Sequence, residues 1–172
     1  MKLDDDDFSL FDLPQRQAQV RAEIDGRWKD LQAQVHPDKF ATQGPAAQRI
    51  AMQWAVRVNE AHQRLRDPLK RAAYLCELRG APLRLNENTR MPTAFLMEQM
   101  AWREALDEAA GAQDVQTLDD ELAQRENELL ADVQLLLDEQ GRTEAAAEQV
   151  RALMFIAKFR SDIDRRLDAL GQ

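Results

Sequence analysis

The sequence predicts an all-α protein, with a helical hairpin unit followed by a three-helix bundle. Three observations support this fold class. Alanine, leucine, glutamate, glutamine and arginine, which favour helices, dominate the 172 residues. Glycine and proline occur only six times each, and most of them separate segments in which apolar residues recur every three or four positions. The hydrophobic fraction of 44% is typical of a globular chain rather than a disordered one.

The chain opens with a short apolar element that cannot be stable alone. It carries Phe8, Phe11 and Leu13, and Pro14 ends it. Because so short a helix is marginal in water, these side chains must dock on another segment.

Two matching amphipathic helices follow and predict an antiparallel hairpin. The first covers residues 17–35 and ends before Pro37, because the residue that precedes a proline is disfavoured in the helical region. The second covers residues 46–65, after a loop over residues 36–45 that contains Gly44. Both have one apolar stripe of similar length, so they should pack together around the short connection. The two stripes are Val20, Ile24, Trp28, Leu31 and Val35, and Ala47, Ile50, Trp54, Val58, Ala61 and Leu65.

The remainder of the chain is also expected to be helical. Asp67 and Pro68 predict the N-cap and first residue of a short helix, and Gly80 predicts its end. Three further helices with short turns predict a bundle, over residues 92–110, 115–140 and 142–170. The expected organisation is a first unit over residues 1–80, a connector over residues 81–91 and the bundle over residues 92–172.

Charge differs between the two halves and limits the classes of partner. The first 80 residues carry 13 basic and 12 acidic side chains, whereas the rest of the chain carries 10 and 19. Nucleic acid is not expected as a partner, because phosphate binding needs clustered lysine and arginine. No apolar run reaches membrane-spanning length and the N-terminus is acidic, so we expect no membrane partner and a cytoplasmic location. The one cysteine, Cys76, excludes an internal disulfide and is expected to be buried.

The loop at the tip of the predicted hairpin contains His36, Pro37 and Asp38. One interpretation is only structural, because proline ends helices and aspartate favours turns and caps. Catalysis by an adjacent His and Asp would need a nucleophile or a metal held nearby. The other histidine, His62, lies in the middle of a helix, where a structural role is expected. We therefore expect no enzymatic activity, no metal and no cofactor, with a small hydrolase as the alternative.

The loop and its context together resemble the J-domain family. A short phenylalanine-containing element precedes an amphipathic helix, then His36-Pro37-Asp38-Lys39-Phe40, then a second long helix. The resemblance implies that the loop and the basic face of the preceding helix dock on the nucleotide-binding domain of a DnaK-class chaperone. Asp38 could then pair with an arginine of the partner. The residues implied in this contact are Arg27, Lys29, His36, Pro37, Asp38 and Lys39.

The first helix of the predicted bundle has a wider apolar arc than a bundle surface needs. Its core face would hold Phe95, Trp102 and Leu106. Off that face lie Leu96, Met97, Met100, Glu104 and Glu108. A methionine-containing patch edged by carboxylates is a plausible docking surface, although it could instead pack on the connector or the first unit. The last helix has a similar excess over residues 150–159, where Phe155 could lie exposed beside the patch.

The segment Thr93-Ala94-Phe95-Leu96-Met97-Glu98-Gln99 makes the resemblance narrower. Joined to a J-domain-like unit and set in an acidic bundle, it resembles the HscB family of iron–sulfur cluster biogenesis over essentially the whole chain. The resemblance implies a co-chaperone that delivers the scaffold protein IscU to the chaperone HscA and stimulates the HscA ATPase. A general J-domain adaptor for an unrelated client is the alternative. The implied scaffold-binding residues are Leu96, Met97, Met100, Glu104, Glu108 and Phe155.

Overall fold

The computed structural model describes residues 1–85 and 91–171, and within these ranges it contains α-helices and one 3₁₀-helix but no strand. The all-α prediction is therefore confirmed. The chain divides into two compact units, Met1–Leu75 and Cys76–Gln172. Residues 86–90 of the predicted connector lie outside the described residues. No helix among the described residues is long and apolar enough to cross a membrane.

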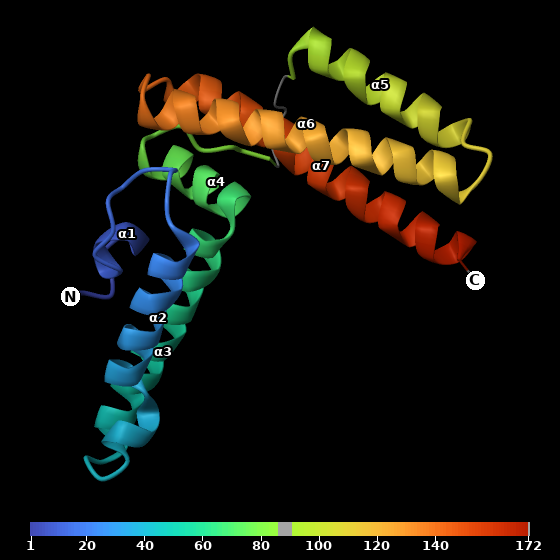
Figure 1. The fold of residues 1–172 in the computed structure, drawn as a ribbon. Helices are drawn as coiled ribbons and strands as arrows, with labels where there is room; N and C mark the ends of the chain where they lie inside the picture. The colour runs from blue at the N-terminus through green and yellow to red at the C-terminus, as the bar shows by residue number, and fades with distance from the viewer. Residues whose placement is uncertain (86–90, 172) are drawn as a thin grey trace. The chain divides into compact units, whose positions relative to one another are not determined.

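The first unit is built on an antiparallel pair of helices, α2 (Arg21–Val35) and α3 (Pro45–Arg66), which confirms the predicted hairpin (Figure 1). The 3₁₀-helix η1 (Pro37–Phe40) lies in the connection at its tip. Apolar side chains with no exposed surface fill the core of this unit, because the stripes of both helices face inward. They include Ile24, Val58, Ala61 and Leu65.

Two residues predicted for this core are exposed instead. Val20 is 62% exposed, because it precedes α2 as an extended N-cap residue rather than lying within the helix. Ile50 is 55% exposed, because the buried face of α3 passes through its neighbour Ala51, which is 4% exposed. The stripe along α3 therefore holds an alanine where the sequence predicted an isoleucine.

The short helix α1 (Asp7–Leu10) docks on this unit as expected. Phe8 and Phe11 are each 1% exposed and Leu13 is 7% exposed. The Phe8 ring also stacks on Tyr74 of α4 (Pro68–Leu78), with centroids 6.0 Å apart. Burial of these rings explains how so short a helix is held in place.

A buried carboxylate reinforces this docking. Asp7 has no exposed surface, and its two oxygens lie 2.8 Å from Nη1 of Arg57 and 2.7 Å from Nε of Arg64. The backbone N–H of Asp7 donates to the hydroxyl of Tyr74 at 3.0 Å. Two guanidinium groups on α3 thus compensate the cost of burying one charge on α1.

Helix α4 (Pro68–Leu78) begins and ends as the sequence predicts. The carboxylate of Asp67 accepts hydrogen bonds from the backbone N–H groups of Leu69 and Lys70 at 2.9 and 3.3 Å. Gly80 follows the helix with a φ of 84°, a left-handed conformation that glycine adopts without strain.

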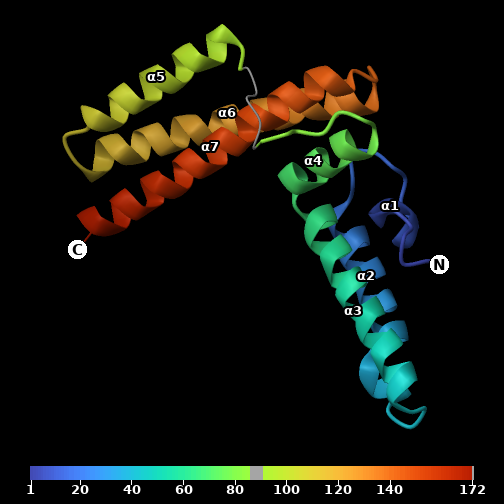
Figure 2. The same cartoon turned by 180° about the vertical axis from the view of Figure 1, so that it is seen from behind.

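The second unit contains α5 (Thr93–Asp107), α6 (Ala112–Asp138) and α7 (Thr143–Leu170), which confirms the three predicted helices. Helices α6 and α7 run antiparallel along each other, and α5 lies beside them (Figure 2). Side chains from α6 and α7 with no exposed surface form the core, including Leu122, Val133, Val150, Ile156 and Ile163.

Candidate functional site

The loop at the tip of the first unit is held by its own backbone. His36 has an extended conformation (φ −60°, ψ 129°), as expected for a residue before proline, and this ends α2. Pro37 then begins η1, where its missing N–H costs nothing. The backbone N–H of Lys39 donates to the carbonyl of His36 at 3.0 Å. The loop is thus a tight turn with a defined shape.

The imidazole of His36 caps this turn. Its Nδ1 accepts a hydrogen bond from the backbone N–H of Asp38 at 3.2 Å. We therefore assign the proton of the neutral ring to Nε2, which makes Nε2–H a donor for another molecule. The Asp38 side chain is 92% exposed and the His36 side chain 57% exposed. The tip consequently offers one donor and one carboxylate.

The predicted basic residues around this loop differ in their surroundings. Lys29 and Lys39 are exposed. Arg27 is half-buried, and its guanidinium lies 3.7 Å from a carboxylate oxygen of Asp12 and 3.9 Å from one of Glu23. The charge of Arg27 is therefore partly balanced within the unit, whereas Lys29 and Lys39 are exposed.

The surface predicted on the first helix of the bundle is exposed along α5. Leu96, Met97 and Met100 are 44%, 66% and 70% exposed. Glu104 is exposed further along α5, and Glu108 is exposed as the C-cap residue. We call these five residues the α5 face. It combines accessible apolar area with two carboxylates, as the sequence predicted.

The opposite side of α5 packs into the bundle. Phe95 is 5% exposed and Trp102 is 9% exposed, with their ring centroids 5.8 Å apart in an edge-on arrangement. Leu106 is half-buried. The predicted division of α5 into a core side and an accessible side is therefore confirmed.

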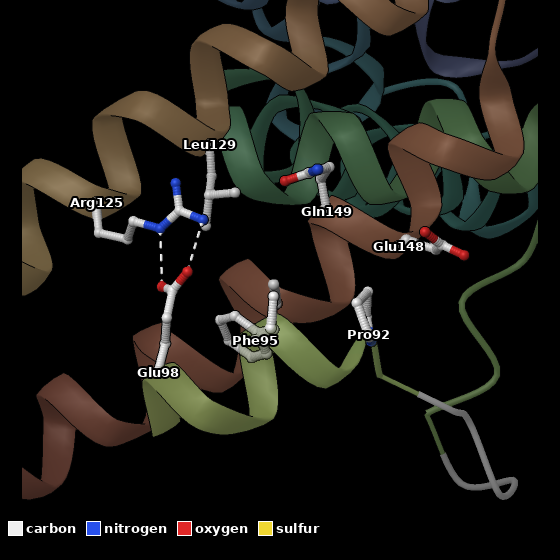
Figure 3. A pocket seen from close by; sticks show the side chains of 9 residues that line it. Pro92, Phe95, Glu98, Arg125, Leu129, Glu148 and Gln149 are labelled. Atoms are coloured by element: carbon white, nitrogen blue, oxygen red, sulfur yellow. Dashed lines mark hydrogen bonds and ion pairs between the residues drawn. The ribbon is translucent and has the colours of Figure 1, made fainter. Parts of the chain in front are cut away.

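An ion pair also fixes α5 beside a cavity of about 180 Å³ (Figure 3). The carboxylate of Glu98 accepts two hydrogen bonds from Arg125 of α6, at 3.0 Å from Nε and 3.1 Å from Nη2. These bonds raise the pKa of Arg125, since they favour its charged form. Phe95 and Pro92 also line this cavity (Figure 3). Glu98 thus acts as an anchor, whereas its neighbour Met97 remains accessible.

Phe155 links α5 to α7 rather than standing free. It is half-buried, with its ring centroid 5.9 Å from those of both Phe95 and Phe159. The guanidinium of Arg103 lies 5.8 Å from the centroid of the Phe155 ring, within range of a cation–π interaction. Arg103 was missed from the sequence, because nothing in the pattern of α5 pairs it with a residue some fifty positions later.

The remaining reactive side chains have structural surroundings. His62 is 7% exposed, stacks on Trp28 with centroids 4.3 Å apart, and lies with its Nε2 2.8 Å from an oxygen of Asp25. Cys76 is buried, and this burial raises its pKa to about 11. Among the described residues no group of three or more His, Cys, Asp or Glu side chains could hold a metal ion.

Comparison with known proteins identifies the family. Residues 91–164 match the family model of the HscB C-terminal oligomerisation domain. The chain is 49% identical over 171 residues to a co-chaperone protein HscB homolog of Paraburkholderia phytofirmans, covering 98% of this chain and 97% of that one. It is 48% identical over 173 residues to the homolog of Burkholderia mallei, covering 99% and 98%.

Two solved structures share the fold. Human co-chaperone protein HscB has a TM-score of 0.90 at 25% identity, covering 96% of this chain and 84% of that one. Chaperone HscB from Vibrio cholerae has a TM-score of 0.82 at 35% identity, covering 96% and 99%. The chain therefore belongs to the HscB family of J-domain co-chaperones, which are not themselves enzymes.

Proposed function

We propose that this co-chaperone binds the iron–sulfur scaffold protein IscU, delivers it to the DnaK-class chaperone HscA and stimulates the HscA ATPase in the cytoplasm. Membership of the HscB family supports a role in iron–sulfur cluster biogenesis. Two separate surfaces, the capped loop and the α5 face, support a protein that binds two partners. The single observation that carries the proposal is the exposure of His36 and Asp38 on a turn of fixed shape.

The loop is suited to act on a chaperone rather than on a substrate. Its shape is set by backbone hydrogen bonds, so little conformational entropy is lost when a partner closes around it. The Asp38 carboxylate can accept charge-assisted hydrogen bonds from an arginine of the partner. Because a ligand shifts an equilibrium only through differential affinity, the loop must bind the hydrolysis-competent state of the chaperone more tightly.

The α5 face is suited to hold the scaffold. Burying one accessible Leu or Met side chain contributes about 1.5–3 kcal/mol. Leu96, Met97 and Met100 therefore offer apolar contacts at the centre of such an interface, and Glu104 and Glu108 favour a partner with basic residues beside its own apolar contact. In this proposal the iron–sulfur cluster chemistry belongs to the scaffold.

The two surfaces together explain delivery. A scaffold held on one unit is carried to the chaperone that the other unit contacts. Linking two moderate contacts in one molecule raises the effective concentration of the scaffold at the chaperone.

The steady-state ATPase rate of an HscA-type chaperone tests the proposal. Wild-type protein should stimulate the rate, and the addition of scaffold should increase it further. His36→Gln should lose most of the stimulation, because a flexible glutamine amide cannot place an acceptor at the Nδ1 position and a donor at the Nε2 position at the same time. Thr42→Ala, which changes an exposed residue of the same loop region, is the matched control and should behave as wild type. Equal stimulation by His36→Gln and wild type would reject the proposal.

A pull-down with the wild-type chain separates the specific client from the alternative. Capture of the scaffold, lost with Leu96→Ala/Met100→Ala/Phe155→Ala, supports the HscB assignment. Capture of an unrelated protein by the same face, without the scaffold, would favour a general J-domain adaptor.

A further inference from the structure

An open apolar groove lies beside the capped loop in the first unit. It has a volume of about 350 Å³, and none of the side chains that line it is charged. Its walls come from the end of α2, from η1 and from the first half of α3. The apolar walls are formed chiefly by Val35, Phe40, Ala47, Ile50 and Trp54.

The chain leaves this groove unfilled. Ile50 is 55% exposed, and Phe40 and Trp54 are only half-buried. Met1 lies at the rim but is itself 62% exposed, so the N-terminal residue does not close the groove. The accessible parts of the isoleucine and the two aromatic rings do not contribute to the stability of the fold, because they remain in contact with water.

The groove and the loop form one continuous surface. Val35 directly precedes His36, and Phe40 is the last residue of η1, so two walls of the groove adjoin the motif at both of its ends. A protein that contacts the exposed side chains of His36 and Asp38 therefore lies next to the groove. Since most of the side chains that line the groove are apolar and none is charged, an apolar group fits it best.

We propose that the partner chaperone inserts an apolar side chain into this groove while it holds the loop. This inference rests on the proposed function and extends the chaperone contact from α2 and the loop onto α3. It also gives Ile50 a role. The exposed part of this side chain does not stabilise the isolated protein, but its burial by the chaperone contributes to binding.

A matched pair of variants tests the groove. Ile50 and Met52 are both 55% exposed on α3, but Ile50 lines the groove whereas Met52 lies on a different surface, beside Val56 and Arg49. Ile50→Asp should raise the concentration needed for half-maximal ATPase stimulation by about tenfold, equivalent to the loss of one good apolar contact. Met52→Asp should leave it within about twofold of wild type. Circular dichroism and thermal melting should show that both variants remain folded, because both side chains are exposed.

Photo-crosslinking identifies the occupant. The photoreactive residue p-benzoylphenylalanine at position 50 should crosslink to the chaperone, and the same residue at position 52 should not. Crosslinking from position 50 to a second copy of the chain or to its own N-terminal segment would overturn the proposal. So would equal effects of Ile50→Asp and Met52→Asp.

The His36→Gln variant distinguishes failure of the groove inference from failure of the proposed function. If His36→Gln abolishes stimulation while Ile50→Asp has no effect, the groove inference fails and the proposed function stands. If His36→Gln has no effect either, both fail.

Discussion

The loop and the α5 face differ in how far the chain prepares them for a partner. The loop has a proline, a 3₁₀ turn and an imidazole cap that fix its shape before any partner arrives. The α5 face consists of flexible methionine and leucine side chains that a partner must order. The first arrangement favours a specific geometry, and the second favours an adaptable apolar contact.

The supports beneath these surfaces differ in a similar way. The first unit relies on a buried charge, since Asp7 meets Arg57 and Arg64 where α1 packs on α3. The second unit relies on a long apolar seam between α6 and α7, to which α5 is tied by its aromatic rings and by the pair of Glu98 and Arg125. The second unit also buries a carboxylate, because Asp119 of α6 accepts hydrogen bonds from Arg160 of α7 at 2.9 and 3.2 Å. That pair joins two long helices that already share the apolar seam, whereas Asp7 holds a helix too short to be stable alone, so loss of the buried carboxylate should cost the first unit more.

The largest expected effect is at the loop. Asp38→Asn keeps the size of the side chain but removes its charge, so stimulation of the chaperone ATPase should fall to near the basal rate. Scaffold binding by the same variant should match wild type. An Asp38→Asn protein that stimulates normally would show that the carboxylate is not the recognised group.

A large loss of stability is expected at Asp7. Asp7→Ala leaves two guanidinium groups without their shared carboxylate, and the free energy of unfolding of the first unit should fall by about 3 kcal/mol. Asp4→Ala, at an exposed position of the same acidic run, should change it by less than about 0.5 kcal/mol. Urea denaturation measures both, and equal changes would contradict the assigned role of the buried pair.

An intermediate effect is expected at the α5 face. Leu96→Ala/Met97→Ala/Met100→Ala removes exposed side chains only, so the fold should be retained while scaffold affinity falls by at least about tenfold. Isothermal titration calorimetry gives the affinity. Stimulation of the chaperone in the absence of scaffold serves as the internal control and should not change.

The smallest effect is a pH dependence confined to the first unit. The pKa of Asp25 is lowered, first because its carboxylate is hydrogen-bonded to His62 and also because of nearby Arg21. A folded-state pKa below the unfolded value means that the carboxylate stabilises the fold above about pH 3.9 and that this contribution is lost as the pH falls through the folded value. Asp25→Asn should therefore lower the melting temperature slightly at pH 6, and the difference from wild type should shrink at pH 3. A difference that stays constant would exclude this origin.

Much of the fold could be predicted because local signals agree with it. Asp67 caps the helix that follows it, Gly80 follows the end of that helix, and Pro37 ends α2. Each of these signals acts on the backbone conformation of its immediate neighbours. The division of α5 into two sides also followed from periodicity. These features need no knowledge of distant contacts.

Long-range packing explains what the sequence could not predict. Asp4 to Asp7 form one acidic run in the sequence, yet only Asp7 is buried, where it meets Arg57 and Arg64. These partners lie 50 and 57 positions further along the chain, so the run itself does not show which aspartate is buried. Periodicity predicts Ile50 for the core, because it does not separate an apolar stripe that passes through Ile50 from one that passes through Ala51. The groove depends on the meeting of α2, η1 and α3, which no single segment encodes.

Complementation between two variants tests the coupling of the two surfaces most directly. His36→Gln and Leu96→Ala/Met97→Ala/Met100→Ala proteins would be mixed in equal amounts, with scaffold and chaperone at limiting concentrations, and the ATPase rate compared with wild type. Since coupling requires both surfaces on one chain, the mixture should reach no more than the rate of the α5-face variant with an intact loop. A mixture that restores the wild-type rate would contradict the account, because the two surfaces would then act independently.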